Sequence, residues 1–137
     1  MAGSKFVFSE LKALDWLLGA FSYSVPSTLY LALFTVAPTS AGGGTECSGG
    51  SYARVAITNN STNWPAATGS GPGTKANGAT ITFPTATAAW GTVVAWALYD
   101  AASAGNGLYW GTLNSPRAVN TSDTPSFAPA ALTITET

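Results

Sequence analysis

The sequence has 137 residues, a net charge of −1, no histidine and one cysteine, and only 8% of its residues are charged. The length predicts one domain, and the scattered basic residues exclude the basic stripe of a nucleic-acid-binding or membrane-surface protein. Typical soluble domains are about 25% charged, and charge is depleted in the cores of protein interfaces, so the deficit favours a chain that assembles over a monomer with a neutral polar surface.

One helix is predicted near the start of the chain, within a helical arm that spans residues 1–24. Ser9 is the expected N-cap, and Gly19 is expected to end the helix. Spacings of three and four residues place three leucines on one helical face. These are Leu11, Leu14 and Leu18. The pattern leaves two interpretations open, because the face either covers the end of a sandwich or docks on a neighbouring subunit.

From residue 25 to residue 137 the pattern predicts short strands separated by turn residues. The predicted strands are 28–35, 52–58, 79–83, 91–100 and 107–113, with up to three more within 116–137. In the strand 91–100, alternation predicts that Trp96 shares a face with Val94 and Leu98. Strands of this length and spacing predict a mainly β fold, an antiparallel β-sandwich of the jelly-roll type, with one short N-terminal helix.

Two long loops interrupt the strands, a Gly-rich one at 37–50 and an Asn/Ser/Thr-rich one at 59–78. Trp64 is expected to anchor the second loop by burying its ring. We expect contacts with other proteins at the helix face and at both loops, with the two arginines outside the arm as ion-pair donors because charge is scarce. The candidate contact residues are Leu11, Leu14, Leu18, Glu46, Arg54, Trp64 and Arg117.

The sequence offers little for catalysis. The absence of histidine removes the Ser-His-Asp and Cys-His triads and the commonest transition-metal ligand, and the lone Cys47 argues against a zinc site. Asp100 and Asp123 are the acids that could face each other across a sugar, but each is explained more simply as a turn cap. The sequence therefore predicts no catalytic residue, cofactor or metal.

The tryptophans leave a second class of function open. Trp64 and Trp90 lie near loops, and exposed rings in a β-sandwich can stack on sugars. The alternative is that each ring plugs the sandwich or a subunit interface, where aromatic residues are enriched. The second reading is preferred, and rings that line one open groove would favour the first.

Three segments together resemble a known family. They are LYLALFT, GGGTE-x-SGG-x-YAR and FP-x-ATA-x-WG-x-V, in that order, within a resemblance that runs along nearly the whole chain. The chain resembles a family of small phage virion proteins whose members are commonly labelled tail fibre proteins. As a compact domain without repeats, it also looks like the jelly-roll cement or decoration proteins of phage heads. That likeness implies a homotrimer seated on the major capsid protein, and it carries no catalytic residue.

The residues and the resemblance lead to one expectation about function. The chain is expected to be a non-enzymatic structural protein of a virion, a capsid cement or decoration protein on the head surface. The alternative is a tail fibre or baseplate component that binds a host carbohydrate. Charged residues interrupt the first apolar stretch and no run approaches about 20 apolar residues, so synthesis in the host cytoplasm without a membrane span is expected.

Overall fold

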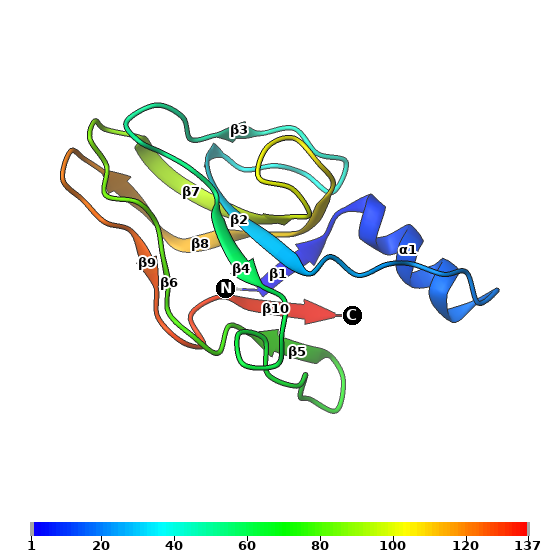
Figure 1. Cartoon of the computed structure of the whole chain (residues 1–137). Coiled ribbons are helices and arrows are strands. Elements are labelled where there is room, and N and C mark those ends of the chain that lie inside the picture. Colours follow the sequence, from blue (N-terminus) through cyan, green and yellow to red (C-terminus); the bar gives the residue numbers. More distant parts are fainter. Residues whose placement is uncertain (1, 137) are drawn as a thin grey trace.

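The structure is a computed structural model that describes residues 2–136 (Figure 1). Its elements are, in chain order, β1 (Ala2–Lys5), α1 (Val7–Leu17), β2 (Thr28–Val36), β3 (Thr45–Glu46), β4 (Val55–Thr58), β5 (Gly73–Ala76), β6 (Ile81–Thr82), β7 (Gly91–Tyr99), β8 (Gly107–Val119), β9 (Ser126–Phe127) and β10 (Thr133–Glu136). The described chain is therefore mainly β with one N-terminal helix, as the strand and turn pattern predicts.

Most of the strands belong to one open, eight-stranded sheet. Its neighbour order is β3-β2-β7-β8-β1-β10-β5, with β4 also paired to β2, while β6 and β9 form a separate two-stranded sheet. The pairs are antiparallel except for β1 and β10, which are parallel. In Figure 1 β4 lies beside β2, and the strands β6, β9 and β10 lie across from β2, β7 and β8. This arrangement is consistent with the predicted antiparallel sandwich.

The core lies between these two groups of strands. Its centre is Trp96 in β7, which is fully buried, and Leu31 and Leu98 are buried beside it in the same cluster. The neighbouring strands pass so close to the indole that they need glycine: a Cβ on Gly3 would lie 2.6 Å from the ring, and one on Gly111 would lie 2.8 Å from it. β1 and β8 therefore close over Trp96 only because both positions lack a side chain.

The opposite face of β2 and β7 carries a smaller apolar cluster. It consists of Phe6, Ala32, Phe34, Ala95 and Ala97. Burial on both faces explains why these two strands read as nearly continuous apolar runs. The prediction that Val94 shares a face with Trp96 is wrong, because the register shifts between Val93 and Ala95. This irregularity places Val93 in the Trp96 cluster and packs Val94 against the smaller one.

The helix differs from its prediction at its start. α1 begins at Val7 with Phe6 at the N-cap position and no side-chain cap, so the expected cap at Ser9 is wrong. Phe6 is buried, and its backbone N–H donates to the Leu108 carbonyl at 3.1 Å, so tertiary packing fixes the start of the helix. The predicted end at Gly19 is confirmed, with α1 ending at Leu17 and Gly19 at φ +110°.

Strand β1 was not predicted, and it lies inside the residues expected to form the helical arm. It pairs with both β8 and β10 and so joins the two parts of the sheet. The division into an arm at 1–24 and a sandwich at 25–137 stays a prediction. Within the described chain, α1 is not long and apolar enough to span a membrane.

Candidate interaction surface

The helix and the segment after it project from the sheet (Figure 1), and their apolar side chains are uncovered. None of the residues 7–17 is buried. Among residues 2–136, the large apolar side chains that are exposed gather here, with Val36 as the exception. Those in the arm are Val7, Leu11, Leu14, Trp16, Leu17, Leu18, Phe21 and Val25. We call residues 7–25 the apolar arm.

The base of the apolar arm is anchored to the sheet. The Val7 N–H donates to the Ser40 carbonyl at 2.9 Å, and Phe8 packs against the core. The Phe8 and Tyr23 rings meet edge to face at 6.1 Å, and the Lys12 ammonium lies 5.7 Å and 5.9 Å from their centroids. These contacts tie α1 to the segment that follows it, close to the sheet. At the far end of the arm, Leu17, Leu18 and Phe21 remain 64–71% exposed.

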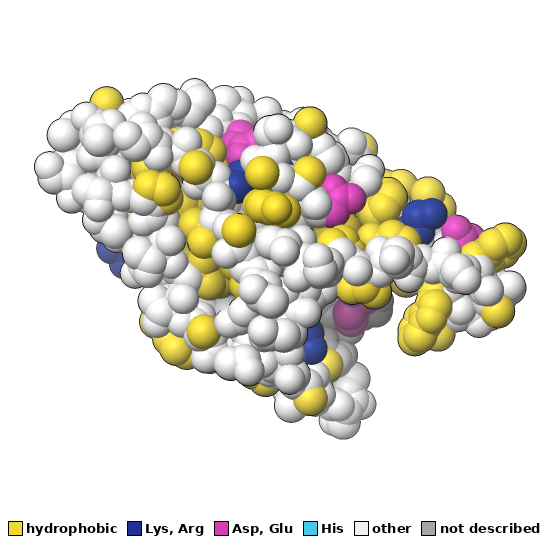
Figure 2. All heavy atoms as spheres, viewed as in Figure 1, with side chains coloured by type: hydrophobic (Ala, Val, Ile, Leu, Met, Phe, Trp, Pro, Cys, Tyr) yellow, Lys and Arg dark blue, Asp and Glu magenta, His cyan; other side chains and the backbone are white. Residues whose placement is uncertain are grey.

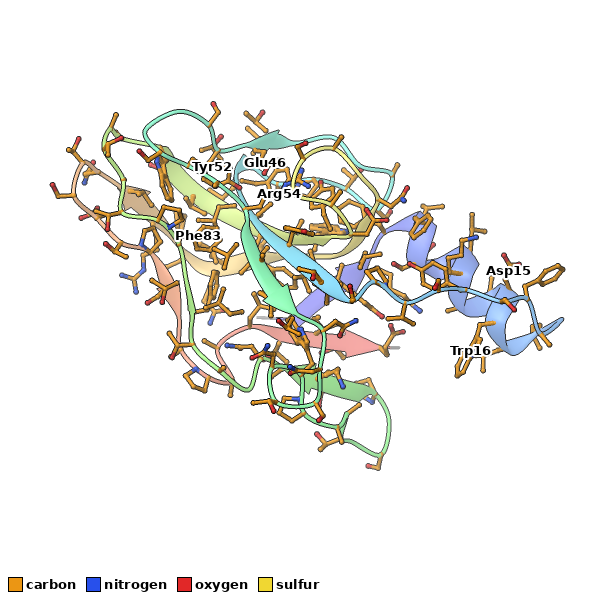
Figure 3. All side chains as sticks on the ribbon, viewed as in Figure 1. Asp15, Trp16, Glu46, Tyr52, Arg54 and Phe83 are labelled. Atoms are coloured by element: carbon orange, nitrogen blue, oxygen red, sulfur yellow. The ribbon has the colours of Figure 1, made fainter. Side chains whose placement is uncertain are left out.

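An apolar groove lies between the arm and the strands. It encloses about 410 Å³, and its walls come from α1, the segment before β2, the Trp64 loop and strands β5, β8 and β10. Trp16 points from α1 to the side of the helix that faces β10 and β5 (Figure 3), and Trp64 lines the opposite wall. Figure 2 shows the hollow between the arm and the body. Two ammonium groups, those of Lys12 and Lys75, line the groove, and its described lining contains no carboxylate.

Two of the predicted contact residues, Glu46 and Arg54, lie together in a partly buried ion pair (Figure 3). The guanidinium donates from Nε and from Nη2 to the two carboxylate oxygens, each at 2.8 Å. It also lies 3.9 Å from the centroid of the Tyr99 ring. Its remaining nitrogen donates to the carbonyls of Ala101 and Ala104 at 2.8 Å and 2.9 Å, so Arg54 holds the β7–β8 loop against β3.

Tyr52 extends this ion pair into the core. Its hydroxyl donates to Glu46 at 2.9 Å and accepts from the Leu33 N–H at 3.0 Å. Burial would raise the pKa of the Glu46 carboxyl, but the hydrogen bonds from Arg54 and Tyr52 outweigh it, so the pKa lies below its ordinary value. Burial is the main cause that raises the pKa of the Tyr52 hydroxyl. The cluster is satisfied by partners within the chain, so it acts as an internal clamp.

The remaining predicted contact residues lie in different environments. Leu11, Leu14 and Leu18 are exposed on the arm, whereas Trp64 is only 5% exposed. Arg117 is exposed on β8 and forms no ion pair with another described residue. It borders a second groove of about 590 Å³, which is lined by both polar and apolar side chains. Arg54 therefore forms an ion pair within the chain, and the expected contacts of both arginines with other proteins stay a prediction.

The two rings considered for sugar stacking are buried, and the two acids are bound to the backbone of their own turns. Trp64 and Trp90 are each 5% exposed, and the Trp90 indole donates to the Gly50 carbonyl at 2.9 Å. Asp100 accepts from the Asn106 N–H at 2.7 Å, and Asp123 accepts from the Asn120 N–H at 2.8 Å. Both acids are therefore turn caps, as predicted. They follow opposite ends of the β7–β8 ladder, so they do not form a pair.

The sequence patterns do not predict two of the residues that line the groove. Trp16 falls outside the leucine stripe, and Lys75 lies in a segment read as a loop. The one available signal was that Trp16 is a large ring in a charged, amphipathic segment. Among residues 2–136 no group of three or more potential metal-ligating side chains occurs. Cys47 is buried, and desolvation raises the pKa of its thiol to about 11.

A protein-family model matches residues 7–135 and is described as Podophage GP4 fiber I protein gp80. The matched range covers the apolar arm, both grooves and the Glu46–Arg54 cluster, and it ends within β10. No curated protein matches the sequence.

Proposed function

The chain belongs to the family Podophage GP4 fiber I protein gp80, a family of phage fibre structural proteins, and on that premise we propose that it is a non-enzymatic component of a phage fibre. It works by binding copies of itself and other virion proteins. The observation that carries this proposal is the apolar arm, which presents large apolar side chains to solvent on a chain with only 8% charged residues. Patches of this kind mark protein interaction sites.

The division of labour within the chain supports an assembly role. The β body satisfies its own ion pair and buries its own core, so it provides a rigid mount. The arm is tied down only at its base and carries no buried residue within α1. A rigid body with an exposed apolar extension suits a component that assembles through that extension.

A second candidate is the capsid cement or decoration protein, a homotrimer seated on the major capsid protein. The low charge favours it, because a protein repeated over a head lattice gains from neutral surfaces that bury without the desolvation cost of charges. The same arm would then clasp a neighbouring subunit on the head.

A carbohydrate-binding role for a fibre receives less support. The rings expected to stack on sugars, Trp64 and Trp90, are buried. Trp16 is exposed in the groove, but most of the groove lining is aliphatic or aromatic. Sugar hydroxyls need several polar partners, and a groove of this kind suits apolar side chains better.

The proposal is tested by a cryo-EM map of the intact phage that locates the chain and counts its copies. A small number of copies confined to the fibres or tail supports the fibre role. Copies spread over the head at the local symmetry axes support the cement role instead. Absence of the chain from the purified particle contradicts both.

A further inference from the structure

The arm carries two different faces, and they point in opposite directions. The residues of α1 that line the groove are Ser9, Lys12, Ala13 and Trp16. At about 100° per residue, Leu11 and Leu14 lie on the other side of the same helix, and Leu18 completes the leucine stripe at the C-cap. Because the groove is already bounded by the first face, the leucine stripe cannot fill the groove of its own chain. A cover for the stripe would therefore come from another molecule.

We propose that the groove of one copy receives the leucine stripe of the arm of a second copy of this chain. This inference deepens the proposed function, on whose assembly role it rests, by naming the partner and the contact. Each copy offers a stripe and a groove, so the contact closes as a dimer or propagates around a ring.

The first argument is the apolar area. The eight exposed apolar side chains of the arm are 42–71% exposed, and at about 200 Å² for a large side chain they present on the order of 1,000 Å². A stable protein interface buries about 800 Å² on each partner. Because Trp16 and Val25 belong to the groove and the leucines to the stripe, the contact reaches this area when each copy buries both its stripe and its groove face against the other.

The second argument is charge complementarity. Glu10 and Asp15 are exposed on the arm and flank the leucine stripe on its two sides. The groove is apolar with Lys12 and Lys75 in its walls and no carboxylate in its described lining. The Lys75 ammonium is held at the wall by donating to the Pro65 carbonyl at 2.8 Å. The Glu136 carboxylate, which accepts from the hydroxyl of the lining residue Tyr109, is already paired with Lys5. An apolar stripe flanked by acids thus matches an apolar groove whose own lining carries Lys12 and Lys75.

The third argument is the size and shape of the groove. Its volume of about 410 Å³ falls within the range of roughly 300–1,000 Å³ in which proteins bury compact apolar ligands. A row of leucines on a helix is the usual occupant of such a groove.

The first test measures self-association of the full chain by sedimentation velocity over a range of concentrations. We expect the wild type to associate reversibly and Leu14→Asp to weaken the association about 100-fold. Val36→Asp is the matched control, because Val36 is 57% exposed and Leu14 is 56% exposed, but Val36 lies outside the arm. A wild type that stays monomeric, or equal effects of the two variants, overturns the proposal.

The second test reverses charges across the contact. Lys75→Glu is expected to weaken association about tenfold, and adding Glu10→Lys with Asp15→Lys is expected to recover most of it. Arg117→Glu makes the same charge change at an exposed site away from the groove and is expected to have no effect. Failure of the added lysines to recover association contradicts the arm–groove contact.

The third test distinguishes a second copy from the chain's own arm. Leu18→Cys is placed in a tagged chain and Lys75→Cys in an untagged chain. The native Cys47 is only 4% exposed and is therefore protected from oxidation. A disulfide between tagged and untagged chains is expected on mixing under oxidising conditions. A double variant that forms the bond only within a monomer overturns the proposal. If the chain sits in the fibre but does not associate in these tests, the inference and the binding between copies fail, while the role as a fibre component that binds other virion proteins stands.

Discussion

The apolar arm and the Glu46–Arg54 cluster show how differently one chain treats its unusual groups. In the cluster, a pair of opposite charges is brought partly out of water, and both are bound by partners within the chain. In the arm, a row of large apolar side chains stays in water without cover. Groups whose partners lie within the chain hold the fold together, whereas groups left without cover are available to another molecule.

The arm is also the part of the chain least able to stand alone. Helices shorter than about 12–15 residues are marginal in water, and α1 has 11 residues and no side-chain N-cap. Its order depends on the anchor at Phe6 and Phe8 and on whatever covers its stripe. Substitutions at several positions test this difference between the body and the arm.

The largest expected difference between the two regions comes from the same substitution at two tryptophans. Trp96→Ala removes a fully buried ring and is expected to destabilise the chain by about 3–5 kcal/mol. Trp16→Ala removes a ring that is 66% exposed, and it is expected to cost less than about 0.5 kcal/mol in the dilute monomer. Urea denaturation measures both. A comparable loss for Trp16→Ala would mean that the arm contributes to the fold of its own chain.

The next largest effect is expected at the internal clamp. Arg54→Met leaves the Glu46 carboxylate partly buried without its cation, which is expected to cost about 2–3 kcal/mol, less than for a fully buried pair. Lys5→Met removes the more exposed pair with Glu136, whose side chains are 24% and 43% exposed, and is expected to cost under about 1 kcal/mol. The midpoints of urea denaturation at neutral pH compare the two. Equal losses would show that Arg54 is solvated rather than clamped.

The body was easier to predict than the contacts between its parts. The long apolar runs gave β2 and β7 within one residue of their ends, because strands buried on both faces have a strong local signal. β1 was missed, since Ala-Gly-Ser-Lys has no branched or aromatic residue. The Trp96 ring lies so close to Gly3 that no side chain fits there, and this tertiary constraint cannot be seen in the local sequence.

The candidate contact surface was predictable in the same uneven way. Periodicity placed the leucine stripe on one helical face, and scarcity of charge singled out Arg54, whose partner Glu46 was also on the list of candidates. The groove was not predictable, because it is formed by α1, β5, β8 and β10, which are far apart in sequence. Trp64 was expected both as a loop anchor and as a contact residue, and its burial confirms the anchor.

A smaller effect is expected from acid. The folded state holds the pKa of Glu46 below its ordinary value of 4.5, so this group binds its proton more readily in the unfolded chain. Its contribution to stability is complete at pH values above about 4.5 and is lost as the pH falls through the lower, folded-state pKa. We expect the stability difference between the wild type and Glu46→Gln to shrink over that acid range, as followed by urea denaturation. A difference that stays constant with pH would mean that the carboxylate contributes no charge-dependent stability.

The smallest expected effect on folding lies in the leucine stripe itself. Leu11 is 56% exposed, so Leu11→Ser removes little buried area and is expected to change the free energy of unfolding of the dilute monomer by less than about 0.5 kcal/mol. Leu33→Ser in the core, where the side chain is 2% exposed, serves as the contrast and is expected to cost several times more. The comparison becomes sharper at high concentration, where an arm covered by a second molecule makes Leu11 count toward stability. A Leu11→Ser loss that is absent on dilution and grows with concentration is the expected signature. A loss independent of concentration would mean that Leu11 acts within its own chain.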